Sequence, residues 1–201
     1  MQPAIYDVIQ AYKPTTIHRL DLEIDEFTPC LRHTETGEIL NTSISIATHE
    51  DFEHVQTWRL REDWKKYLND PEHFSVYKIT LEGDTGIQGL VCFEKDHQEE
   101  QLDENEIFRW IELSVVESAP HNVGKQKIYA GVAAHLLAIA CKNSFDSNCS
   151  GFVSFFAKNE KLFEHYQVAL GANPVDNLDF RLLISSEKAK ELVDVYFNKE
   201  G

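Results

Sequence analysis

One short stretch of the chain combines small and basic residues in a way that suits anion binding. These residues are Lys125, Lys127, Tyr129, Gly131, Val132, Ala133 and Ala134. A helix N-terminus carries a partial positive charge and unpaired N–H groups, so small residues there let a phosphate approach the backbone closely. The stretch therefore predicts a pyrophosphate site, although glycine and alanine at a helix start also suit tight packing of the helix on a sheet.

The elements around this turn must position it. Residues 108–116 alternate in polarity, which predicts a strand. One face of this strand would carry Ile111, Leu113 and Val115, and the other face would carry Trp110, Glu112 and Ser114. Residues 131–145 are apolar almost all round, which predicts a buried helix, and residues 151–157 are typical of a strand that is buried on both faces in a parallel sheet.

Alternation and turn residues predict the other elements. Residues 74–81 and 87–93 form an expected antiparallel hairpin, whereas the acidic residues 94–106 are expected to form a solvated loop. A helix over residues 159–170, a strand over 180–184 and a terminal helix from Ser186 follow. Near the start, Leu20, Leu22 and Ile24 alternate with Asp21, Glu23 and Asp25. This alternation predicts a half-buried strand, with a second strand of residues 39–46 returning beside it.

The order of these elements resembles the GNAT superfamily of acyl-CoA-dependent N-acetyltransferases over residues 74–185. The Gly131-Val-Ala133 turn and the spacing from Asn159 to Tyr166 before Gly171 support the resemblance. It implies an α/β fold of the mixed α+β kind, with a central mixed sheet whose splayed parallel strand pair is flanked by helices. Residues 1–201 would form a single domain, with an atypical strand and helix region over residues 1–70.

The resemblance also implies roles for individual residues, with acetyl-CoA as acyl donor and no metal. The backbone of Val115 and Val116 would pair with the pantetheine arm, and the amides near Gly131, Val132 and Ala133 would hold the pyrophosphate. Glu112 and Tyr166 match positions that act in some members as general base and as the acid that protonates the departing thiolate.

Each of these residues also has a structural interpretation. Glu112 is either a base with a pKa raised by Trp110 or a rim carboxylate, and Glu117 is a weaker substitute. The Tyr166 phenol, with a reference pKa of about 10, is neutral at pH 7 and also suits packing on the sheet. Asn159 would cap its helix and contact the cofactor as well.

The turn departs from the family pattern at one position. Ile128 stands where the family has Gln or Arg, so a side-chain contact to phosphate is missing unless Lys125 or Lys127 replaces it. The loop of residues 117–130 is also longer than usual. His121 within this loop is expected to be a hydrogen-bonded surface group.

Composition limits the partners and the location. The formal net charge of -15 argues against nucleic acid, which would need lysine and arginine gathered on one face. No apolar stretch is long enough for a membrane span, and the first residues lack the basic and apolar regions of a targeting segment, so no membrane partner and a cytoplasmic location are expected. The four cysteines have no CxxC pair and no matching histidine spacing. Whether the chain forms a homodimer is left open.

The function expected from this reading is N-acetyl transfer from acetyl-CoA to a primary amine, by direct attack of the amine on the thioester. The amine would belong to a small molecule or a peptide. Two alternatives stay open: a module that binds CoA or a protein partner without turnover, and a structural protein that has kept the fold and lost the ligand.

Overall fold

The computed structural model describes residues 2–14, 16–58 and 63–197. Its helices are α1 (Gln2–Ala11), α2 (His49–Val55), α3 (Trp64–Leu68), η1 (Pro120–Asn122, a 3-10 helix), α4 (Val132–Asp146), α5 (Glu160–Leu170) and α6 (Ser186–Phe197). Its strands are β1 (Arg19–Leu20), β2 (Leu31–His33), β3 (Ile39–Leu40), β4 (Thr42–Ile46), β5 (Phe74–Leu81), β6 (Ile87–Glu94), β7 (Gln98–Gln101), β8 (Ile107–Ser118), β9 (Tyr129–Ala130), β10 (Val153–Ala157), β11 (Asn173–Asp176) and β12 (Arg181–Ile184).

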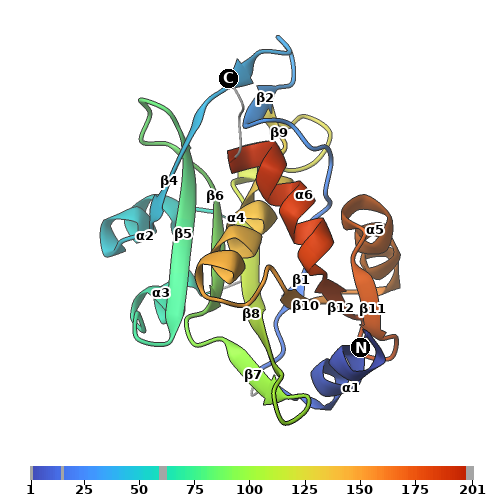
Figure 1. Ribbon diagram of the computed structural model, residues 1–201. Coiled ribbons are helices and arrows are strands. Elements are labelled where there is room, and N and C mark those ends of the chain that lie inside the picture. Colours follow the sequence, from blue (N-terminus) through green and yellow to red (C-terminus); the bar gives the residue numbers. More distant parts are fainter. Residues whose placement is uncertain (1, 15, 59–62, 198–201) are drawn as a thin grey trace.

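A mixed sheet in the order β11-β12-β10-β8-β6-β5-β4 forms the centre of the molecule. Figure 1 shows β4 at one edge of this sheet and β11 towards the other. The pair of β8 and β10 is parallel, whereas the other neighbours along this path are antiparallel. The predicted mixed sheet with one parallel pair flanked by helices is confirmed.

Alternation along the strands sends side chains to two helical layers. On β6, Val91 and Phe93 belong to the core cluster that contains α4, α5 and α6, whereas Leu90 and Cys92 belong to the cluster that contains Trp64 of α3. Helix α1 packs against Trp110 on this second face, at the other end of the sheet. The sheet is thus covered on both faces, as the long apolar stretches require.

The predicted hairpin is confirmed, because β5 pairs with β6. Thr48 and Asp51 form the capping box of α2. Four expectations are wrong. The expected strand of residues 20–25 is reduced to β1, which ends at Leu20. The acidic segment contains β7, which pairs with β8, and residues 39–46 form β3 and β4, which pair with β2 and β5. These strands therefore do not lie beside residues 20–24, because β1 pairs with β10.

The described residues contain no helix that is long and apolar enough to cross a membrane.

Candidate functional site

A cleft opens where β8 and β10 separate. The two strands pair only at Ile111 with Val153 and at Glu112 with Ser154. Immediately beyond, the register of β8 against β6 shifts so that Ser114 is the extra residue of a bulge. A bulge bends its strand and increases the local twist, which explains why β8 turns away from β10 at this point.

The bulge also changes which face each later residue occupies. Leu113 packs with α4, but Val115 packs with Trp64 on the opposite face, and Val116 returns to the side of α4. The expectation that Val115 shares a face with Ile111 and Leu113 is therefore wrong. Side chains alternate between the two faces of the sheet only up to Ser114, because the extra residue in the bulge reverses which face each later side chain occupies.

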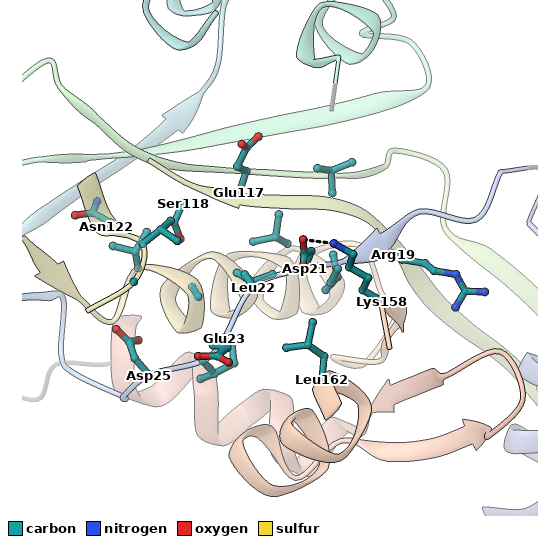
Figure 2. Close-up of a pocket in the computed structure, with 18 of the residues that line it drawn as sticks. Arg19, Asp21, Leu22, Glu23, Asp25, Glu117, Ser118, Asn122, Lys158 and Leu162 are labelled. Carbon is teal, nitrogen blue, oxygen red and sulfur yellow. Dashed lines mark hydrogen bonds and ion pairs between the residues drawn. The ribbon is translucent and has the colours of Figure 1, made fainter. Parts of the chain in front are cut away.

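The cleft has a volume of about 1570 Å³ and draws its lining from four parts of the chain. The second half of β8, the loop that follows it, the start of α4 and the start of α5 form three of its sides. The fourth part is an extended segment near the N-terminus. Figure 2 shows Glu117 and Ser118 on one side, Leu162 on the other, and Asp21, Leu22 and Glu23 between them.

Most of the predicted cofactor-binding residues meet at this cleft. The lining includes Val115, Val116, Lys125, Lys127, Val132, Ala133 and Asn159. Tyr129, Gly131 and Ala134 are close to these residues in the chain but do not belong to the lining. Ala134 is completely buried, and the ring of Tyr129 packs edge-on against His33. The turn and the strand pair are thus brought together, although the sequence signals for each lie well apart in the chain.

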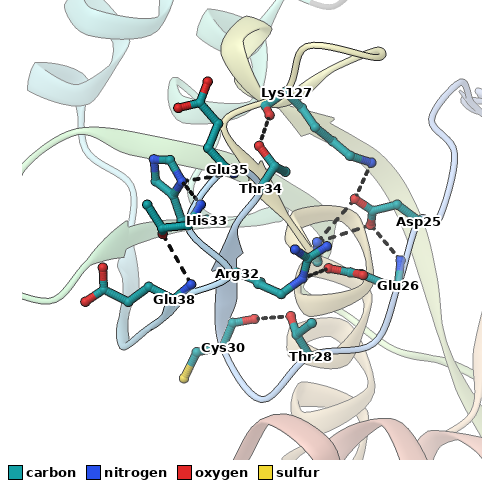
Figure 3. Close-up of polar contacts among 12 residues, drawn as sticks. Asp25, Glu26, Thr28, Cys30, Arg32, His33, Thr34, Glu35, Glu38 and Lys127 are labelled. Atoms are coloured by element: carbon teal, nitrogen blue, oxygen red, sulfur yellow. Dashed lines mark hydrogen bonds and ion pairs between the residues drawn. The ribbon is translucent and has the colours of Figure 1, made fainter.

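Gly131 is the N-cap of α4 and has a left-handed backbone with φ of 88°. As a glycine, the N-cap residue has no side chain of its own to bond the N–H groups of the first turn, so this helix end suits an anion. The anion in place is the carboxylate of Asp25, which accepts from the Gly131 N–H at 3.2 Å and pairs with Lys127 Nζ at 2.7 Å. Figure 3 shows Asp25 bound to Lys127 in this position. The predicted anion site therefore holds a carboxylate of the chain itself.

Replacing Gly131 by Ala should destabilise the protein more than replacing Gly37 by Ala. Both glycines have positive φ, which costs an alanine about 1–2 kcal/mol. A Cβ at Gly131 would also lie 2.4 Å from Thr28 Oγ1, whereas nothing lies within 4 Å of a Cβ at Gly37. Overpacking adds about 1–3 kcal/mol, so urea unfolding should separate the two variants by that amount. Equal losses of stability would contradict the contact with Thr28.

Tyr166 is fully buried in α5 and points towards the same segment that carries Asp25. Its hydroxyl donates to the carbonyl oxygen of Leu22 at 2.7 Å, and its ring meets Phe155 edge-on. Burial raises the pKa of Tyr166 above its ordinary value, so the phenol is neutral at pH 7 and keeps its proton. Leu22 and Glu23 lie in the lining of the cleft, which places the segment between Tyr166 and the open space.

Asn159 is the N-cap of α5, as expected. Its Oδ1 accepts from the Leu162 N–H at 3.0 Å, and the residue also lines the cleft. His121 is hydrogen-bonded to Gln88 Oε1 at 2.8 Å, which agrees with the expected surface role.

Glu112 lies outside the cleft, which corrects its assignment as a catalytic base. It is buried and pairs with Arg181 at 2.7 Å, and Trp110 Nε1 donates to the same carboxylate at 3.2 Å. Burial raises the pKa of Glu112, although Arg181 lowers it. Because Arg181 also donates to the carbonyl oxygens of Ile9 and Tyr12, the pair fastens the end of α1 to the sheet.

Glu117, unlike Glu112, is a carboxylate of β8 that lines the cleft. Its Oε2 accepts from Trp64 Nε1 at 2.7 Å, which orients the side chain from α3. Sequence reasoning ranked Glu117 below Glu112 because no residue pattern reveals the bulge at Ser114. The Asp25 contacts were missed for a similar reason, since alternation of polar and apolar residues does not show which distant residues a segment contacts.

Three lysines flank the extended segment. Lys158 pairs with Asp21 and Lys161 with Glu23, both at 2.6 Å, in addition to the pair of Lys127 with Asp25. The described residues contain no group of three or more His, Cys, Asp or Glu that could hold a metal ion.

Comparison with known proteins supports the fold. No family model and no curated protein matches the sequence. A mutant of the AtaT toxin, solved with the C-terminus of the antitoxin AtaR and acetyl-CoA, is 15% identical and has a TM-score of 0.51, covering 76% of this chain and 97% of its own. AtaT complexed with acetyl-methionyl-tRNAfMet is 15% identical with a TM-score of 0.52, over 76% of this chain and 99% of that one.

The KacTA-DNA complex is similar to the same extent. It is 16% identical with a TM-score of 0.52, over 76% of this chain and 98% of that one. These structures correct one expectation: excluding nucleic acid as a partner was wrong, because proteins of this fold are solved with DNA and tRNA. Net charge describes the whole chain, whereas several lysines gather around the cleft.

Proposed function

We propose that this chain, which has the fold of the GNAT superfamily, transfers an acetyl group from acetyl-CoA to an amine. The observation that carries the proposal is the cleft between β8 and β10, which runs from the bulge at Ser114 to the N-terminus of α4. A free strand edge at one end and a helix N-terminus at the other suit a ligand that has an amide-rich arm and a pyrophosphate.

The parts of acetyl-CoA have natural positions in this cleft. The backbone of Val115 and Val116 would pair with the pantetheine arm. The amides at Gly131, Val132 and Ala133 would hold the pyrophosphate, with Lys125 and Lys127 supplying the charge that Ile128 lacks. The Asp25 carboxylate supports this placement, since it already occupies the helix end as an anion. Asn159 lies within reach of the arm from the side of α5.

We assign removal of the amine proton to Glu117 rather than Glu112. Glu117 lines the cleft and is oriented by Trp64, whereas Glu112 is held by Arg181 outside it. The amine would lose its proton to Glu117, directly or through water, as its nitrogen forms a bond to the thioester carbonyl carbon. The carbon–sulfur bond then breaks, and Tyr166 gives its proton to the departing thiolate and regains one from solvent.

Calorimetric titration with acetyl-CoA tests the cofactor site. Wild-type protein should bind, and Lys125→Gln should weaken binding about tenfold, as expected for the loss of one hydrogen bond to a charged group. Lys190→Gln is the matched control, because Lys190 is an exposed lysine on α6 outside the cleft lining. Absence of binding both by the wild type and by a folded Asp21→Asn/Asp25→Asn variant would refute the proposal, and equal effects of the two lysine variants would move the phosphate site elsewhere.

A non-catalytic CoA-binding module is the second candidate, favoured by the chain segment that lies in the cleft and by Ile128. Release of free thiol from acetyl-CoA distinguishes the two functions. The amines to be tested include small amines, peptide N-termini and aminoacyl-tRNA, because a protein of this fold is solved with acetyl-methionyl-tRNA. Binding without thiol release in any of these reactions would favour the module.

A further inference from the structure

Residues 20–25, here named the strap, cross the cleft in extended form. Their side chains alternate: Leu20 and Ile24 are buried in the main core, whereas Asp21, Glu23 and Asp25 face solvent and the lysines. Within the strap, Leu20 is the residue that belongs to a strand, because β1 ends there and pairs with β10. Figure 2 shows the strap crossing the cleft with Asp21 bound to Lys158.

We propose that the strap is autoinhibitory and must move away from the cleft before acetyl-CoA can bind productively. This inference rests on the proposed function, because it concerns the same cofactor site. The strap and the cofactor would compete for three groups: the Gly131 N–H, the Lys127 ammonium and the Tyr166 hydroxyl.

The first contact places a negative charge at the helix end. The Asp25 carboxylate accepts from Gly131 and is neutralised by Lys127, as a phosphate group would be. Two anions cannot share this position, because like charges at contact distance repel strongly. Phosphate binding at α4 therefore requires Asp25 to leave.

The second contact occupies the proposed acid. The Tyr166 hydroxyl donates its hydrogen to Leu22 O, and the strap separates it from the open part of the cleft. A phenol whose hydrogen is held by a carbonyl oxygen cannot donate it to a thiolate. The closed strap thus blocks both cofactor binding and proton transfer.

The strap is held in a way that permits release. Residues 21–28 belong to no helix or strand. The pair of Glu23 with Lys161 is largely solvent-exposed and the pair of Asp21 with Lys158 is partly exposed, and such pairs contribute little to stability. The backbone is fastened at few points besides β1, among them the Lys158 N–H bond to Leu20 O and the Ile24 N–H bond to His165 Nε2. Leu20, which is buried and belongs to β1, anchors the start of the segment so that it can return.

The test compares two double variants that each remove two paired carboxylates. Asp21→Asn/Asp25→Asn loosens the strap, whereas Asp146→Asn/Glu191→Gln removes acids that pair with Lys142 and Lys188 away from the cleft. The strap variant should bind acetyl-CoA about tenfold more tightly than wild type, because apparent affinity falls with the fraction of closed molecules. The control should change affinity less than twofold, which measures the effect of net charge alone.

Hydrogen exchange in the wild type provides an independent measurement. Saturating acetyl-CoA should speed amide exchange in residues 20–26, since the strap leaves its hydrogen bonds. Unchanged or slower exchange there, or equal affinities of the strap variant and its control, would overturn the strap proposal while leaving cofactor binding intact. If neither the wild type nor the folded strap variant binds acetyl-CoA, the proposed function itself fails.

Discussion

Replacing Arg181 by Met should lower the free energy of unfolding by about 3–5 kcal/mol, which is the cost of leaving a buried charge without its partner. Arg181 and Glu112 are almost completely buried and lie 2.7 Å apart. The guanidinium also donates to the carbonyl oxygen of Tyr12 at 2.7 Å, so the variant loses a contact to the segment after α1 as well. Urea unfolding at pH 7 measures the loss.

The double variant Glu112→Leu/Arg181→Met should recover much of this stability, because it removes both charges. Recovery would be incomplete, since the carbonyl oxygens of Ile9 and Tyr12 still lose their donor. A double variant that is less stable than Arg181→Met would contradict the role of the unpaired carboxylate.

The stability lost on Arg181→Met should also depend on pH. Burial raises the pKa of Glu112 in the folded protein, so this group favours the folded state when protonated and costs stability as pH rises above the ordinary glutamate value of about 4.3. Arg181 is a cation that lowers this pKa, so its removal should raise the pKa of Glu112 further. The loss should be smaller at pH 5 than at pH 8, and a loss independent of pH would contradict the role of Arg181 in lowering the pKa of Glu112.

Replacing Tyr166 by Phe should reduce kcat by about 10²–10⁴-fold, the usual contribution of a general acid. The same change removes the hydrogen bond to Leu22 O that holds the strap, so acetyl-CoA should bind more tightly while turnover falls. A fall of kcat together with a fall of Kd is the signature of a residue that serves both the reaction and the strap. Calorimetry gives Kd, and thiol release with an active amine gives kcat.

Tyr196→Phe is the matched control. Tyr196 is also a buried phenol, its pKa is raised by burial, and its hydroxyl donates to Gly131 O at 3.5 Å. It lies on α6, outside the cleft lining, so its replacement should leave kcat within a few-fold of wild type. Full turnover by Tyr166→Phe would remove Tyr166 from the mechanism, and equal losses in both variants would point to a structural effect.

Local elements were predictable because their signals are local. The apolar residues of α4, the Asn159 cap of α5 and the buried strand β10 all depend on side chains within a few positions of each other. The periods of helix and strand therefore predicted the fold over most of residues 74–185. Predictions became less accurate near the N-terminus, where α1 was missed and the partners of β3 and β4 were wrong.

The sequence by itself determined the turn at Gly131, the buried phenol at Tyr166 and the alternating acids of residues 20–25. Tertiary structure alone decided three further points. The bulge at Ser114 brought Glu117 into the cleft, Arg181 withdrew Glu112 into a buried pair, and the strap came to lie on the groups expected to bind the cofactor. The physical reason is distance along the chain: Leu22 meets Tyr166 across 144 positions and Asp25 meets Gly131 across 106, and no local pattern specifies such contacts.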